Sequence, residues 1–103
     1  MSTLKDILNE PDLKENILNS TVSNSFKLNE SVDSKIILQA VAIDDFTNEH
    51  IPLTISFKES LDKCHTTISV ESVRDNNTIT VPNNLIKDCI NSILLEHTRD
   101  WDE

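Results

Sequence analysis

The hydrophobic residues of this chain follow two different periods. In the middle of the sequence, residues 51–58 alternate between large apolar side chains and other residues, so that Ile51, Leu53, Ile55 and Phe57 share one face. A period of two is that of a strand with one buried face. Towards both ends the apolar residues recur at intervals of three and four, as on a helix that packs on one side. The pattern therefore predicts strands in the middle of the chain and helices at its ends.

Three helices are expected. Pro11 suits the first turn of a helix but not its interior, so residues 1–19 are predicted to form two short helices, the second of which begins at this proline. The residues expected to face inward are Leu4, Ile7, Leu8, Leu13, Ile17 and Leu18. Residues 83–98 predict one longer helix, with Asn83 or Asn84 as its cap. Its apolar stripe consists of Leu85, Ile86, Cys89, Ile90, Ile93, Leu94 and His97.

The segment from 35 to 82 is expected to contain the main strands of an antiparallel sheet. Residues 35–43 are almost continuously apolar, which predicts a strand covered on both faces near the centre of the sheet. In the later strands Ile68, Val70, Ile79 and Val81 are expected inward. The Arg-Asp-Asn-Asn segment at 74–77 is expected to reverse the chain, with its asparagines at positive φ in place of glycine.

The remaining segments are polar. Residues 20–34 are rich in Ser and Asn, and they predict either a loop or a weak strand over 21–28 with Val22, Phe26 and Leu28 on one face. Residues 99–103 form a charged tail. The sequence as a whole predicts a single α+β domain, residues 1–103, in which an antiparallel meander of three to five strands carries the long C-terminal helix on one face.

Glycine is absent from all 103 residues. Phosphate-binding loops, dinucleotide fingerprints and the nucleophile turn of hydrolases all depend on glycine, so those functions are excluded and no cofactor is expected. Cys64 and His65 are neighbours and could in principle form a nucleophile and its base. Adjacent strand residues point to opposite faces, so a catalytic pair is not expected here. A metal is not expected either, because no close pair of Cys or His at ligand spacing occurs.

The charge balance points to the kind of partner. The chain has 18 acidic against nine basic side chains, a formal net charge of -9. This charge repels nucleic acid and anionic membranes, so direct binding to either is not expected, whereas a protein with a basic surface is favoured. The sequence also shows no secretory leader and no apolar run of membrane-spanning length, and we expect a cytoplasmic protein with reduced cysteines.

These observations favour a protein that acts through a protein interface without catalysis, as an inhibitor, adaptor or assembly factor, including those of phage or mobile-element type. The residues expected at the interface are Asp44, Asp45, Glu49, Leu94, Leu95 and Trp101. Three alternatives remain. One is an acidic homo-oligomeric chaperone or scaffold that associates through the C-terminal helix at Leu95. Another is a DNA mimic that uses the acids at 44, 45 and 49. The third is an enzyme, which requires a pocket that gathers His50, His65 or His97 with an acid.

Overall fold

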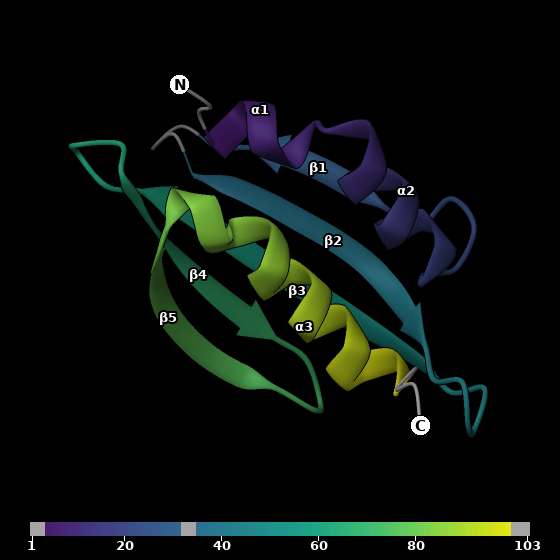
Figure 1. The fold of residues 1–103 in the computed structure, drawn as a ribbon. Helices are drawn as coiled ribbons and strands as arrows, with labels where there is room; N and C mark the ends of the chain where they lie inside the picture. The colour runs from purple at the N-terminus through teal and green to yellow at the C-terminus, as the bar shows by residue number, and fades with distance from the viewer. Residues whose placement is uncertain (1–3, 32–34, 100–103) are drawn as a thin grey trace.

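The computed structural model describes residues 4–31 and 35–99. Two short helices come first, five strands follow, and a 3-10 turn leads into the last and longest helix (Figure 1). The elements are α1 (Leu4–Leu8), α2 (Pro11–Asn19), β1 (Lys27–Glu30), β2 (Ile36–Ile43), β3 (His50–Glu59), β4 (His65–Glu71), β5 (Asn76–Pro82), η1 (Asn83–Leu85) and α3 (Ile86–Thr98).

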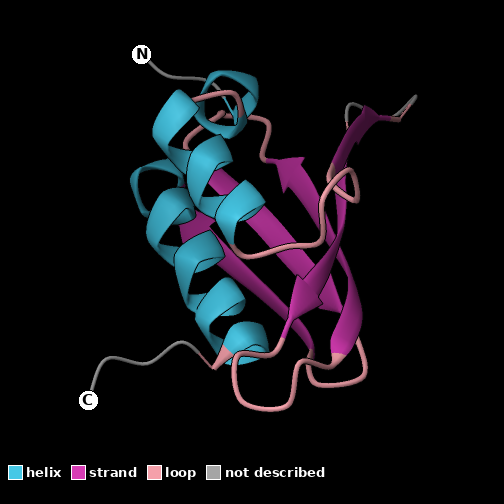
Figure 2. Cartoon of the chain, turned by 90° about the vertical axis from the view of Figure 1, so that its right-hand side faces the viewer, coloured by secondary structure: helices cyan, strands magenta, loops and turns pink. Residues whose placement is uncertain are grey.

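The five strands form one antiparallel sheet in the order β1-β2-β3-β4-β5, so that each strand pairs with its neighbours in sequence. Figure 2 shows the helices together on one side of this sheet, while the other side carries no helix. The predicted α+β meander with a C-terminal helix on one face is therefore confirmed. Short connections explain the topology, because parallel neighbours would need long crossovers.

The core lies between the sheet and the helices. Every second residue of β3 is buried. Leu53, Ile55 and Phe57 form one hydrophobic cluster with Ile68 of β4 and with Ile86 and Ile90 of α3. Phe57 is fully buried. Each large apolar side chain removed from water in this way contributes about 1.5–3 kcal/mol. A core built almost entirely from Ile and Leu thus holds the two layers together.

The N-terminal helices follow the prediction with one exception. Pro11 occupies the first turn of α2, and Leu13 and Ile17 are buried against the core. Leu18, which was expected inward, is instead 52% exposed. A nine-residue helix lying over one edge of a sheet buries only a narrow stripe, and Leu18 falls outside it.

The prediction for β2 is wrong in one respect. The strand forms where it was expected, but it lies second in the sheet and is covered by helices on one face only. Leu38 is buried on the covered side, whereas Ile37 and Val41 on the other side are partly exposed. A run of apolar residues cannot by itself distinguish burial on two faces from burial on one face with neighbouring strands beside it.

The polar segment before β2 contains a short strand. β1 begins at Lys27, later than the predicted start at 21, and residue Thr21 makes only an isolated bridge to Ala42. Phe26 and Leu28 pack against the core as expected. Residues 32–34 of this segment lie outside the described residues.

The hairpin between β4 and β5 turns earlier than predicted. The Ser72 N–H donates to the carbonyl oxygen of Asp75 at 2.9 Å, which closes the turn over residues 72–75. Asn76 and Asn77 belong to β5, and neither has a positive φ. The non-glycine residues with positive φ are Asn24, Asn48, Lys63 and Arg99.

The C-terminal helix begins without a side-chain cap. Asn83, one of the two expected caps, instead accepts a hydrogen bond from the Thr66 hydroxyl at 2.7 Å and donates to Glu59 at 3.0 Å. Leu85 precedes α3 and is exposed, so it does not join the apolar stripe as predicted. The helix ends at Thr98, and the left-handed backbone of the following Arg99 lets its N–H donate to the carbonyl oxygen of Leu95.

Candidate functional site

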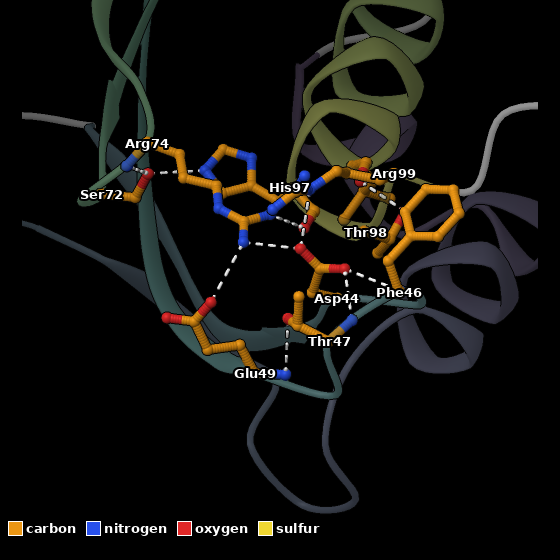
Figure 3. A network of polar contacts seen from close by, with 10 residues as sticks. Asp44, Phe46, Thr47, Glu49, Ser72, Arg74, His97, Thr98 and Arg99 are labelled. Carbon is orange, nitrogen blue, oxygen red and sulfur yellow. Dashed lines mark hydrogen bonds and ion pairs between the residues drawn. The ribbon is translucent and has the colours of Figure 1, made fainter.

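A buried carboxylate lies at the end of the sheet where β2 leads into β3. Asp44 follows β2 directly, and its side chain is 0% exposed. Its Oδ1 accepts hydrogen bonds from the N–H groups of Phe46 and Thr47, at 2.7 and 3.1 Å (Figure 3). The aspartate thereby shapes its own loop, as aspartates commonly do in turns.

Both arginines of the sequence bind the other oxygen of this carboxylate. Arg74 comes from the turn between β4 and β5 and places Nη2 at 2.6 Å from Oδ2. Arg99 follows α3 and places Nε at 2.8 Å from the same oxygen. Arg74 also donates to the carbonyl oxygen of His97 at 2.9 Å. The Asp44 carboxylate thus connects its own loop, the β4–β5 turn and the end of α3 (Figure 3).

The pKa of Asp44 reflects this environment. Burial alone would raise the pKa, but the two backbone hydrogen bonds and the two guanidinium groups outweigh it and hold the pKa of Asp44 well below its usual range. The carboxylate therefore stays charged at all physiological pH values. With both oxygens filled by donors, it has no lone pair left for a metal ion or for a transferred proton.

A serine and a histidine lie beside this cluster. Ser72 Oγ is 2.6 Å from His97 Nε2, and His97 Nδ1 is 2.8 Å from the carbonyl oxygen of Ile93. Because a carbonyl only accepts, Nδ1 carries a proton, and in the neutral imidazole Nε2 then accepts from the hydroxyl of Ser72. The distance resembles that of a nucleophile and its base.

The surroundings of this pair do not suit catalysis. Ser72 Oγ already accepts the N–H groups of Arg74 and Asp75, both at 3.1 Å. His97 is fully buried, and its Nδ1 is hydrogen-bonded to the main-chain oxygen of Ile93 and not to a carboxylate. The contacts of Ser72 and His97 therefore hold the β4–β5 turn against α3.

Of the other histidines, His50 lies at the end of the sheet that carries this pair, and His65 lies at the opposite end. His50 begins β3 and His65 begins β4, and because the two strands are antiparallel these residues lie at opposite ends of the sheet. Among residues 4–31 and 35–99, no group of three or more His, Cys, Asp or Glu residues is placed to hold a metal ion. The same residues contain no helix with the length and hydrophobicity needed to cross a membrane.

The structure separates the residues predicted at an interface. Asp44 was expected at the interface, but its side chain is buried between two arginines. It is not available to a partner or for DNA mimicry. Glu49 is 64% exposed and lies 3.4 Å from Arg74, and Asp45 is also exposed.

Two of the remaining predicted residues lie on α3. Leu94 is buried in the core, so it cannot contact a partner, whereas Leu95 is 40% exposed. Trp101 lies outside the described residues. The sequence analysis missed the role of Arg74 and Arg99, although a chain with only two arginines offered one signal, since arginine suits buried ion pairs better than lysine does.

A second candidate surface is the side of the sheet that faces away from the helices, here called the open face. Residues paired across neighbouring strands point to the same side, which assigns every second residue to this face. Its members are Lys27, Asn29, Ile37, Gln39, Val41, Ile43, His50, Pro52, Thr54, Ser56, Lys58, His65, Thr67, Ser69, Glu71, Asn76, Thr78, Thr80 and Pro82.

The open face is rich in hydroxyl groups and poor in charge. Thr67 Oγ1 and Thr80 Oγ1 lie 3.0 Å apart, and Ser69 Oγ and Thr78 Oγ1 lie 3.2 Å apart, so hydroxyls of β4 and β5 are hydrogen-bonded across the strands. Two lysines and one glutamate are its only charged residues, in a chain of net charge -9. The acidic excess therefore lies elsewhere on the molecule.

Comparison with known proteins adds no family to this description. No family model, no curated protein and no solved structure matches the chain.

Proposed function

We propose that this chain is a small protein-binding protein that acts without catalysis, as an inhibitor, adaptor or assembly factor, and that it receives its partner on the open face of the sheet. The observation that carries the proposal is the contrast in charge. Three of the 19 residues that define the open face are charged, whereas 26% of the whole sequence is charged. Depletion of charge is typical of the centre of protein interfaces.

The order of this surface supports the same proposal. Side chains on the central strands are held between neighbours on both sides, and the hydroxyls of Thr67, Ser69, Thr78 and Thr80 are paired with each other. A surface that is already ordered loses little side-chain entropy when a partner binds. The partly exposed Ile37 and Val41 add apolar area next to these hydroxyls.

The acidic residues outside the open face are placed to attract a basic partner before it makes contact. Asp6, Asp12 and Glu15 lie exposed on the helical layer, and Asp45 and Glu49 lie exposed in the loop after β2. A negative field of this kind draws a basic partner towards the molecule and raises the rate of encounter. We therefore propose a partner with a basic surface whose contact residues meet the hydroxyl-rich sheet.

Affinity capture from the native cell extract at low salt tests the proposal. The baits are the wild-type chain, Ser56→Arg at the centre of the open face, and Leu18→Arg on the helical layer. Both variants add one positive charge at a side chain that is not in the core, so the pair is matched in charge. We expect a protein that the wild type and Leu18→Arg retain and that Ser56→Arg loses.

Quantitative mass spectrometry of the three samples separates the outcomes. Equal recovery by Ser56→Arg would place the contact away from the open face. Loss with Leu18→Arg alone would assign it to the helical layer. Recovery of no specific protein by any bait would remove the support for an interface. Circular dichroism of each variant checks that the fold is retained.

A further inference from the structure

The outer edge of β5 is open to another strand. β5 is the last strand of the sheet, and among the described residues it pairs only with β4. Its register with β4 runs without interruption from Asn76 to Pro82. The opposite edge differs, because β1 is only four residues long and carries Lys27 and Glu30.

The hydrogen bonds at both ends of β5 define which groups point outward. The Asn83 N–H donates to Cys64 and the Ser72 N–H donates to Asp75, each at 2.9 Å. The backbone N–H and C=O groups of residues 75 and 83 thus point towards β4. Because these groups alternate in direction along a strand, those of the odd-numbered residues between 75 and 83 also point towards β4. The N–H and C=O groups of Asn76, Thr78 and Thr80 therefore point away from the sheet.

Pro82 fits this alternation. It stands at an outward position, where the missing N–H removes nothing from the ladder with β4. The outward N–H of Thr78 is held at 3.0 Å by the side-chain oxygen of Asn77, a contact that an added strand would replace. The edge thus offers donors and acceptors to a second strand.

This edge lacks the features that usually protect a free edge strand. Natural sheets blunt their edges with charged residues, inward charges, bulges or short strands. The seven residues of β5 include no charged side chain, and the only proline stands at the end. An edge strand of this kind is expected to pair with another strand, and the sequence of β5 indicates which strand that is.

We propose that two copies of this chain associate through antiparallel pairing of their β5 strands, with the two-fold axis at Ile79. The segment Thr78-Ile79-Thr80 reads the same in both directions, so this axis sets Thr78 opposite the partner's Thr80 in hydrogen-bonded positions. The outward N–H and C=O groups of both threonines are then satisfied. The closed two-fold pairing joins the two sheets into one.

The side chains on both faces of the edge fit this arrangement. Ile79 lies on the helical side, 47% exposed, at a groove of about 210 Å³ between β5 and α3. The groove is also lined by the apolar Val70, Cys89 and Ile93 and, at its rim, by Asp75 and Glu96. In the dimer the partner's Ile79 lies directly beside it, since residues at non-hydrogen-bonded positions approach most closely. On the open face the threonines of both copies continue the hydroxyl pairs.

Charge also favours a second copy at this place. The net charge of -9 makes two copies repel over most of their surface, and the uncharged β5 edge is where repulsion is least. With the axis at Ile79, Asp75 lies opposite the partner's Asn83 and not opposite another acid.

A disulfide test locates the axis. Paired Cα atoms at non-hydrogen-bonded positions are about 4.5 Å apart, within the range that a disulfide spans. In a chain whose two cysteines are replaced (Cys64→Ser, Cys89→Ala), Ile79→Cys is expected to give a cross-linked dimer under mild oxidation with copper-phenanthroline. Leu95→Cys in the same background is the matched control and should stay largely a single chain.

Light scattering on a sizing column supplies the second measurement. The wild type should elute with the mass of two chains, and Ile79→Lys should raise the dissociation constant of the dimer at least about tenfold, because two like charges then meet at the axis. Leu95→Lys and the open-face variant Ser56→Arg should leave the dimer intact, so this test is independent of partner binding. If Ile79→Lys fails to fold, the cross-linking result decides.

Two outcomes would overturn the inference. One is a wild-type chain that remains monomeric at about 100 μM in high salt. The other is a dimer that Leu95→Lys disrupts and Ile79→Lys does not, together with cross-linking through Leu95→Cys, which would assign self-association to α3.

Discussion

At the scale of single residues, Asp44 has the most demanding position in this molecule. A buried carboxylate is tolerated only with strong compensation, and here two arginines and two N–H groups provide it. Removal of the charge would take away the buried carboxylate that both Arg74 and Arg99 bind, and would leave Arg74 with the exposed Glu49 as its carboxylate partner. The aspartate is therefore expected to matter for stability far more than an exposed acid does.

The comparison of Asp44→Asn with Glu49→Gln tests this expectation. Glu49 contacts the same Arg74 but is exposed, and exposed pairs contribute little. We expect Asp44→Asn to lower the midpoint of thermal unfolding at pH 7 by roughly 10 °C or more, and Glu49→Gln to change it by about 3 °C or less. Calorimetry of the three proteins gives the values.

The same variant should also change the response to acid. Because the pKa of Asp44 is lower in the folded than in the unfolded protein, its stabilising contribution is complete above the unfolded pKa of about 4 and is lost as the pH falls towards the folded pKa. The wild type should therefore lose stability more steeply than Asp44→Asn below about pH 5. Parallel profiles of the two proteins would contradict the role assigned to Asp44.

At the scale of elements, the turns show how a chain without glycine folds. The β3–β4 connection places Lys63 at a φ of 61°, a conformation in which Cβ crowds the following carbonyl oxygen. The geometry is needed because the Lys63 N–H donates to Ser60 at 3.0 Å and its carbonyl oxygen accepts from Asn83 at 3.0 Å. A glycine at this position would adopt the same backbone without strain.

Lys63→Gly is therefore expected to stabilise the protein. Relief of the left-handed strain is worth about 1–2 kcal/mol, and the greater freedom of glycine in the unfolded chain offsets about 0.4–1 kcal/mol of it. The net gain should be about 0.5–1 kcal/mol in urea unfolding. Lys58→Gly, which places the same substitution within β3, should destabilise the protein, and so should Lys63→Val.

The elements that the sequence predicts well are those whose burial repeats locally. The alternation from Ile51 to Phe57 specifies β3, and the threefold and fourfold spacing of Ile86, Ile90 and Ile93 specifies α3. The predicted burial of Leu18 and Leu85 was wrong because the width of a buried helical stripe depends on what packs against it. Neighbouring elements, and not the helix itself, set that width.

The candidate site was less predictable, for a related reason. Asp44 and Arg99 are 55 positions apart, and nothing in their local sequence shows that they meet. The pattern of residues 44–50 is that of a polar loop, in which acids are ordinarily solvated. Which acid becomes buried is decided by how the loop, the β4–β5 turn and the end of α3 come together.

At the scale of the whole molecule, charge and topology act in opposite directions. The meander leaves β5 as an open edge, which favours association, while a net charge of -9 keeps two copies apart. The interaction with a basic partner has the opposite electrostatic sign. Salt screens both effects, with a Debye length of about 10 Å at 0.1 M and about 3 Å at 1 M.

The two associations should therefore respond to salt in opposite ways. As sodium chloride rises from about 0.05 to 0.5 M, the dissociation constant for self-association should fall, because like charges are screened while the uncharged contacts at β5 remain. The dissociation constant for a basic partner should rise over the same range. Sedimentation equilibrium measures the first and calorimetric titration the second. If self-association weakened with salt, contacts between opposite charges and not the uncharged β5 edge would have to hold the two copies together.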